Sequence, residues 1–183
     1  MRYVCIDIET LGLSIQAPII QVAAVFVDNH VITGQFETLV KYPAYNNCEP
    51  YAMSMHPELL RRLAKATDEE AVPIEYLAKR MLNWFKLAEF NPMFPTVFAG
   101  KNVGTFDIPR LDHHTKGEFS RWIRSDYRYL DPGNMFVRRG DARVPSLDEI
   151  LKREGIPGAV DHTALADALA TVAAIERGLD GRV

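Results

Sequence analysis

Short apolar runs near the N-terminus have the length and composition of β-strands. Residues 3–8 form a β-rich run, and residues 19–27 form a longer, almost unbroken apolar run. Asp28 and Asn29 provide a turn, so residues 31–41 are expected to return as the second arm of a hairpin. The pattern therefore predicts three strands, of which the last two form an antiparallel pair.

After residue 41 the apolar residues change to helical spacing. Residues 43–55 hold two prolines and two adjacent asparagines, which predicts a surface loop. Between residues 74 and 85 apolar side chains recur every three or four positions, which predicts a helix started by the acidic run at 67–70. The other expected elements are helices at 56–63, 109–116, from Ser146 and at 164–174, and strands at 96–99 and 127–130.

This order of elements predicts an α/β fold in a single domain over residues 1–183. We expect a three-layer α/β/α sandwich around a mixed five-stranded sheet, with an antiparallel hairpin first and parallel strands after it. Ligand sites in such sheets lie at the carboxyl ends of the central strands. The residues expected at that edge are 7–10, 100–107 and 130–131.

Composition narrows the class of protein. With 48% hydrophobic and 25% charged residues, the chain can bury a core and is not expected to be disordered. No apolar run approaches the roughly 18 residues of a membrane-spanning helix, and Asp7 comes too early for a signal peptide. The two cysteines, Cys5 and Cys48, are too few for a disulfide framework and fit a reducing cytoplasm.

The net charge of −3 argues against a large basic surface of the kind that holds long duplexes. A nucleic-acid enzyme stays compatible with this charge, because a small acidic metal site can make the total negative. The spacing of a few acids must therefore decide the function.

The first expected strand ends in Asp7 and Glu9, which lie two residues apart and so point to the same side. Two neighbouring carboxylates repel each other unless a proton or a cation lies between them. All-oxygen ligands suit Mg²⁺ or Mn²⁺ better than zinc. Taken alone, an Asp-x-Glu pair is more often a charged strand end in solvent.

Asp107 and Asp167 extend this acidic set from distant parts of the chain. Asp107 follows Asn102 where the expected strand passes into a helix, because Pro109 is tolerated in a helix's first turn. Alone, Asp107 is an ordinary acid at a helix start. Asp167 lies near the start of the alanine-rich terminal helix.

His162 lies five residues before Asp167, so the two side chains would point about 140° apart in one regular helix. Thr163 or Asp161 is therefore expected to cap the helix, which leaves His162 in the entry loop. From there its imidazole can reach over a carboxylate-bound metal ion. A lone histidine beside a helix start is usually just a surface residue.

The combination is more specific than its parts. Asp7, Glu9, Asp107 and Asp167 supply four carboxylates from three segments expected at one sheet edge, and His162 accompanies them. Two divalent ions about 4 Å apart can activate a water and stabilise the departing oxygen of a phosphodiester. An imidazole with a pKa of about 6.5 can accept the proton of that water at neutral pH.

These motifs resemble those of the DEDDh 3′–5′ exonuclease superfamily, whose ribonuclease H-like fold is shared with DNA-polymerase proofreading subunits. Residues 7–13 resemble the first motif, residues 102–107 the second, and residues 162–167 the third with its His-x4-Asp spacing. The resemblance extends from residue 2 to about residue 178. It implies two Mg²⁺ or Mn²⁺ ions held by the four acids, with His162 as general base.

In detail, the chain resembles oligoribonuclease. Residues 127–131 and the region around His56 are similar to that branch. The resemblance implies that Leu13 acts as a base-stacking wedge, that His56 and Tyr129 contact nucleotides, and that the protein is a homodimer.

The second motif, with Phe106 directly before the acid, is closer to general exonucleases and proofreaders, so both RNA and DNA stay open as substrates. The resemblance further implies that Thr10, Leu11 and Leu13 seat the terminal nucleotide. Asn102 and Phe106 would then lie near its sugar and base.

The function that we expect is a metal-dependent 3′–5′ exonuclease that releases 5′-mononucleotides from short single-stranded RNA or DNA. Two alternatives stay open. One is a proofreading or repair-type DNA exonuclease, and the other is a non-cleaving nucleic-acid-binding module of the same fold. No membrane partner is expected.

Overall fold

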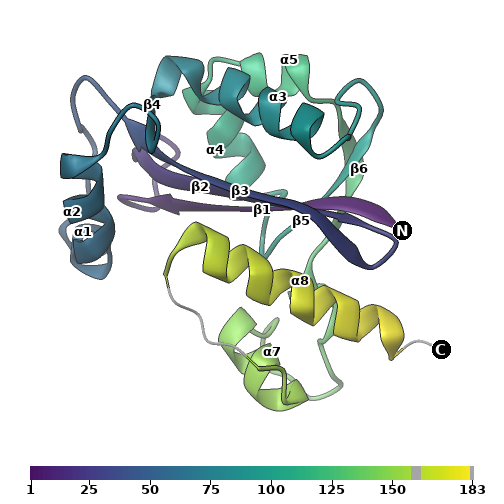
Figure 1. Cartoon of the computed structure of the whole chain (residues 1–183). Coiled ribbons are helices and arrows are strands. Elements are labelled where there is room, and N and C mark those ends of the chain that lie inside the picture. Colours follow the sequence, from purple (N-terminus) through teal and green to yellow (C-terminus); the bar gives the residue numbers. More distant parts are fainter. Residues whose placement is uncertain (158–161, 182–183) are drawn as a thin grey trace.

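One mixed sheet of six strands runs through the computed structural model, which describes residues 1–157 and 162–181 (Figure 1). The strands are β1 (Arg2–Thr10), β2 (Ile19–Asp28), β3 (Val31–Lys41), β4 (Ala71–Pro73), β5 (Thr96–Ala99) and β6 (Ser125–Leu130). Their order across the sheet is β4-β3-β2-β1-β5-β6. The pairs β1–β2 and β2–β3 are antiparallel, whereas β1–β5, β5–β6 and β3–β4 are parallel. The expected mixed sheet, antiparallel at first and parallel afterwards, is confirmed.

Helices cover both faces of this sheet (Figure 1). One face carries α3 (Leu77–Leu87), α4 (Asp107–His114) and α5 (Glu118–Trp122). The other carries α8 (Ala164–Asp180), against which α6 (Pro132–Met135) and α7 (Leu147–Glu154) pack. The remaining helices are α1 (Pro50–Met55), α2 (Pro57–Lys65) and the short 3₁₀ helix η1 (Ile74–Tyr76). The three-layer α/β/α arrangement expected from the sequence is thus confirmed.

Alternate residues of β1 pack into opposite layers. The residues in the core beneath α3, α4 and α5 are Val4, Ile6 and Ile8, and those in the core beneath α8 are Tyr3 and Cys5. Asp7 and Glu9 continue the second series, so they point toward the α8 side at the end of the strand.

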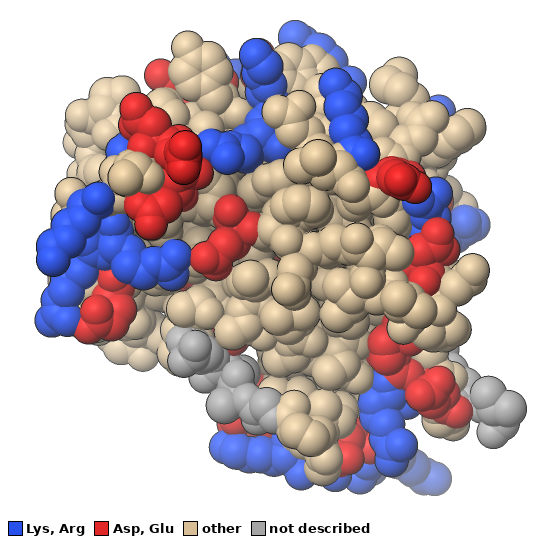
Figure 2. Space-filling model, in the orientation of Figure 1, with Lys and Arg blue, Asp and Glu red and all other residues tan. Residues whose placement is uncertain are grey.

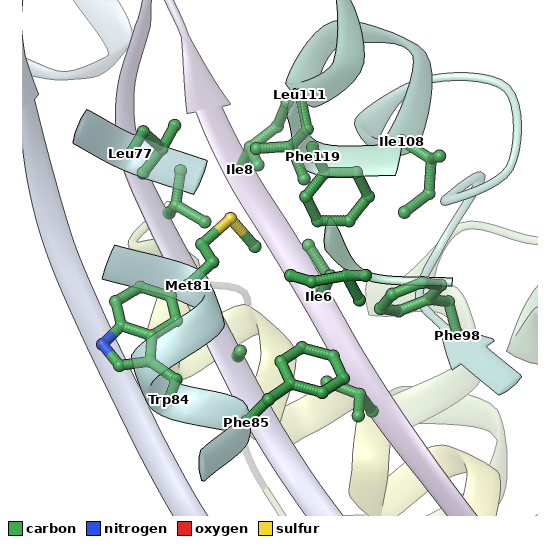
Figure 3. Packing of buried hydrophobic residues seen from close by; sticks show 14 of the residues in the cluster. Ile6, Ile8, Leu77, Met81, Trp84, Phe85, Phe98, Ile108, Leu111 and Phe119 are labelled. Carbon is green, nitrogen blue, oxygen red and sulfur yellow. The ribbon is translucent and has the colours of Figure 1, made fainter. Parts of the chain in front are cut away.

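Aromatic rings fill the layer between the sheet and α3 to α5 (Figure 3). The ring of Phe98, on β5, lies with its centroid 6.4 Å from that of Phe85 and 5.8 Å from that of Phe119. Leu111 of α4 is fully buried in the same cluster. This packing holds α4, which begins with Asp107, against β1.

The terminal helix α8 approaches the sheet closely through small residues. Ala164 and Ala168 are fully buried, and the Cys5 thiol donates a hydrogen bond to the Ala168 carbonyl over 3.5 Å. The Ala164 N–H donates to Oε1 of Gln21 over 3.0 Å. The first turns of α8, which carry Asp167, are therefore fixed beside β1 and β2.

Three local expectations are corrected by the structure. The sheet has a sixth strand, β4, whose three residues are too few to show a periodic pattern. The acidic run at 67–70 closes a turn instead of starting a helix, because the Glu70 carboxylate accepts hydrogen bonds from the N–H and hydroxyl of Thr67. The segment 43–55 contains a helix, α1, that begins at Pro50. The strands at 31–41 and 96–99 have the expected ends, the other expected elements are present with shifted ends, and α5 and α6 are additional short helices.

Candidate active site

Three carboxylates meet at the end of β1. Asp7 and Glu9 come from the last residues of that strand, and Asp167 comes from the first turn of α8. One carboxylate oxygen from each residue lies within 4.8 Å of the oxygens from the other two. Oxygen ligands at this spacing can share one divalent cation.

Asp107 lies beside this group and is only 4% exposed. It is the first residue of α4, and its Oδ1 accepts a hydrogen bond from the Ile8 N–H over 3.1 Å. Ile8 separates Asp7 from Glu9 along β1, so this bond ties the fourth carboxylate to the other three. The negative charge of Asp107 also contributes to the raised pKa of Asp7.

Burial and mutual repulsion raise the pKa values of Asp7, Glu9 and Asp107. Burial, followed by repulsion from the neighbouring carboxylates, raises the pKa of Asp7 well above its ordinary value. Burial and the charge of Asp167 raise the pKa of Glu9 to about 8. Burial also raises the pKa of Asp107 to about 8, although backbone hydrogen bonds and the charge of Arg110 oppose this. Such a set favours cations at neutral pH, and its oxygen donors fit Mg²⁺ or Mn²⁺.

One histidine lies next to the carboxylates, and a second histidine neighbours the first. Nε2 of His56, at the start of α2, lies 3.5 Å from Oε2 of Glu9, and the His56 side chain is buried. Burial, and then the neighbouring His162, lower the pKa of His56. His162 itself is exposed and has a φ of 53° just before α8, where Thr163 occupies the N-cap position. Asp161, the other residue expected to cap this helix, lies outside the described residues.

An open pocket of about 230 Å³ adjoins Glu9. Its lining includes four of the residues expected to contact a nucleotide, which are Thr10, Leu13, His56 and Phe106. The side chains of Leu13 and Tyr51 are 77% and 76% exposed at this pocket. Because much of the lining is apolar or aromatic, the pocket suits the flat faces of a nucleobase.

The structure does not bring the other three expected nucleotide contacts to this pocket. Leu11 is 1% exposed and packs in a cluster with Ile20 and Leu59, so its side chain is turned into the core. Asn102 and Tyr129 line a separate pocket of about 350 Å³ beyond the ends of β5 and β6.

Two charged residues that the sequence analysis does not single out contact the same loop. Oε1 of Glu49 accepts a hydrogen bond from the Leu13 N–H over 2.9 Å, and the Arg110 guanidinium donates to the Leu13 carbonyl. The sequence contains a weak signal for Arg110, which follows Asp107 by one helical turn. For Glu49, in a segment expected to be an irregular surface loop, it contains none.

Basic and acidic side chains are interspersed on the face shown in Figure 2, with no large area of one sign. This distribution agrees with the small net charge of −3. Among the helices of the described ranges, none combines the length and apolar character needed to cross a membrane.

Comparisons with known proteins give a family and a fold. The sequence model of a family described as Exonuclease (RNase_T) matches residues 4–175. No curated protein matches the sequence.

Among solved structures, E. coli Exonuclease I in complex with a dT13 oligonucleotide has a TM-score of 0.73 at 20% identity, over 99% of this chain and 41% of that one. A moderately thermophilic Exonuclease I from Methylocaldum szegediense has a TM-score of 0.72 at 22% identity, over 99% and 40%. The zinc-bound E. coli ExoI–ssDNA complex has a TM-score of 0.72 at 19% identity, over 99% and 41%. The chain therefore spans about two fifths of the length of these structural neighbours and shares their fold.

Proposed function

Because the chain belongs to the Exonuclease family, within the DEDDh 3′–5′ exonuclease superfamily, we propose that it hydrolyses single-stranded nucleic acid from the 3′ end and releases 5′-mononucleotides. The observation that carries this proposal is the approach of the Asp7, Glu9 and Asp167 carboxylate oxygens to within 4.8 Å of one another. Asp107 completes the set of acids.

The four acids would hold two Mg²⁺ or Mn²⁺ ions, which when bound activate a water and stabilise the departing oxygen. His162 accepts the proton of the attacking water as general base, and its exposed position before α8 leaves the imidazole accessible. A bond forms between the water oxygen and phosphorus. The bond from phosphorus to the 3′ oxygen of the preceding nucleotide breaks, so the phosphate stays on the released nucleotide.

The pocket beside Glu9 would receive the terminal nucleotide. Leu13 and Phe106 offer apolar and aromatic surfaces to its base, and Thr10 and His56 offer polar atoms to its sugar and phosphate. Asn102 and Tyr129, at the second pocket, would contact the preceding nucleotide.

Single-stranded DNA is the substrate that we favour over RNA, because E. coli Exonuclease I, which shares the fold, is found in complexes with dT13 and dA16 oligonucleotides. Location in the cytoplasm is supported by the free Cys5 and Cys48. The single domain over residues 1–183 and the homodimer stay predictions.

A time course with end-labelled strands tests this function. Single-stranded DNA and RNA, as dinucleotides and 20-mers, are incubated with Mg²⁺, Mn²⁺ or excess chelator. We expect the label of 3′-labelled strands to appear at once in mononucleotides, whereas 5′-labelled strands should become progressively shorter. Excess chelator should stop both reactions. Cleavage that persists in chelator, or that starts from the 5′ end, would refute the proposal. Binding without metal-dependent cleavage would identify a non-cleaving module instead.

A further inference from the structure

Leu13 combines an exposed side chain with a firmly held backbone. Its side chain is 77% exposed, yet Glu49 accepts from its N–H and Arg110 donates to its carbonyl. These partners are 36 and 97 residues away along the chain, so two separate segments fix one loop residue. Backbone groups of exposed loops are ordinarily solvated and mobile. Here the apolar side chain of Leu13 is exposed to solvent while its backbone is held by hydrogen bonds on both sides.

Arg110 also holds the ring of Phe106. Its Nη1 donates to the Phe106 carbonyl over 3.0 Å, and its guanidinium carbon lies 3.5 Å from the centroid of the Phe106 ring. Phe106 is the N-cap residue of α4, which carries Arg110 one turn later. The Arg110 side chain is 6% exposed, so solvent does not compete strongly for these contacts.

One guanidinium therefore links two walls of the same pocket. Leu13 and Phe106 both line the pocket beside Glu9, and they belong to segments far apart in the sequence. A guanidinium is planar, stays charged and offers donors in fixed directions, so it can fix two carbonyls and a ring at once. A lysine ammonium in its place can donate to a carbonyl but cannot stack its plane on the ring.

We infer that Arg110 is a positioning residue that sets the spacing between Leu13 and Phe106, and with it the fit of the pocket to the terminal base of a nucleic-acid strand. This inference rests on the proposed function, because it assumes that a 3′ end enters this pocket. Arg110 acts through the two side chains that it holds. Its loss should affect recognition of the base more than the metal-bound reaction.

The test compares two single-stranded DNA 20-mers that differ at the 3′ end, one with deoxyadenosine and one with an abasic deoxyribose. We expect wild type to show a kcat/KM about tenfold higher on the normal end, the scale of one base-stacking contact. Arg110→Met should bring this ratio close to one, mainly by raising KM on the normal end. Arg110→Lys should give an intermediate ratio. The Mn²⁺ concentration for half-maximal activity should stay unchanged in Arg110→Lys, which keeps the positive charge beside Asp107.

Arg2→Met provides the matched control. Arg2 donates to the Glu89 carbonyl over 2.7 Å, and its guanidinium carbon lies 4.0 Å from the centroid of the Phe90 ring, at the other end of β1. This substitution removes the same type of contact away from the pocket, so the ratio should match that of wild type. A partial loss of folded protein alone would lower the rates on the normal and the abasic end equally, so the ratio of kcat/KM would stay as in wild type.

A second readout does not need cleavage. A strand with 2-aminopurine at its 3′ end is titrated with protein in Ca²⁺, and stacking of the base quenches its fluorescence. We expect quenching with wild type and with Arg2→Met, and much less with Arg110→Met. If wild type quenches the fluorescence in Ca²⁺ but does not cleave in Mg²⁺, the proposed function is wrong, and weaker quenching by Arg110→Met would still support the inference about Arg110. If Arg110→Met keeps both the quenching and the kcat/KM ratio of wild type, the inference is wrong. Should Arg110→Met not fold, the same outcome for Arg110→Lys would show that the inference is wrong.

Discussion

The Oδ1 atom of Asp107 accepts a hydrogen bond from the backbone N–H of Ile8 over 3.1 Å. This contact joins the first residue of α4 to the end of β1, across 99 residues of sequence. Because Ile8 lies between Asp7 and Glu9, the bond fixes a buried carboxylate at a set place relative to the other acids. The site is therefore built from backbone hydrogen bonding as well as from side chains.

Asp107→Asn should separate metal binding from folding. The amide keeps an oxygen that can accept from Ile8 but loses the buried charge, so the metal-free protein should be at least as stable as wild type. Each kcal/mol of repulsion that is relieved would raise Tm by about 2–4 °C. Mg²⁺ should stabilise this variant much less than wild type. Thermal unfolding in chelator and in Mg²⁺ measures both effects.

Asp148→Asn is the control for that experiment, because Asp148 is a half-buried acid in the first turn of α7 that pairs with Lys152. It should leave the stabilisation by Mg²⁺ as it is in wild type. Stabilisation of Asp107→Asn by Mg²⁺ to the same extent as wild type would contradict a role for Asp107 in metal binding.

His162→Ala should lower kcat by about 10²- to 10⁴-fold, the usual scale for the loss of an acid–base group. Stabilisation by Mg²⁺ should persist, because His162 is not among the acids that hold the ions. Single-turnover cleavage measures the first effect and thermal unfolding the second. His113→Ala, which removes an exposed histidine near the end of α4, should cleave at the wild-type rate. A normal rate for His162→Ala would refute its role as general base.

The stability of the metal-free protein should fall as pH rises. The pKa of Glu9 is raised from 4.5 to about 8 and that of Asp107 from 3.8 to about 8. Between these values the folded state binds protons that the unfolded state has released, so the free energy of unfolding decreases with increasing pH. Urea unfolding in chelator at pH 5, 6.5 and 8 should show this decrease. Mg²⁺ should reverse it most strongly at pH 8, and a stability that rises from pH 5 to pH 8 in chelator would contradict the account.

Leu13→Ala and Leu11→Ala should have opposite consequences although the residues are two apart. Leu13 is 77% exposed, so its truncation should change stability by less than about 0.5 kcal/mol while raising KM for single strands. Leu11 is 1% exposed, so its truncation should cost about 2–5 kcal/mol. Urea unfolding and steady-state kinetics distinguish the two. An unchanged KM for Leu13→Ala would show that its side chain does not contact the substrate.

The sequence was sufficient to predict the elements with strong patterns. The apolar runs of β1 and β2, the turn after Asp28 and the helical spacing of α3 all reflect local preference together with burial, and each is present. The convergence of Asp7, Glu9 and Asp167 was also predictable, because strand alternation and sheet topology determine which residues reach the same edge.

Features that depend on contacts between distant segments could not be predicted. Strand β4 exists because three residues pair with β3, and nothing in so short a segment indicates a partner. Leu11 and Leu13 are chemically alike, and only the path of the loop turns one into the core. The contacts of Arg110 with Leu13 depend on how α4 packs against that loop, which no local pattern records.

Crystals grown with Mn²⁺ provide the most direct test, because anomalous scattering locates this ion independently of any assumption about the site. We expect two Mn²⁺ peaks about 4 Å apart, bound by carboxylate oxygens of Asp7, Glu9, Asp107 and Asp167. An anomalous map without Mn²⁺ at these carboxylates, at metal concentrations that support cleavage, would contradict the account.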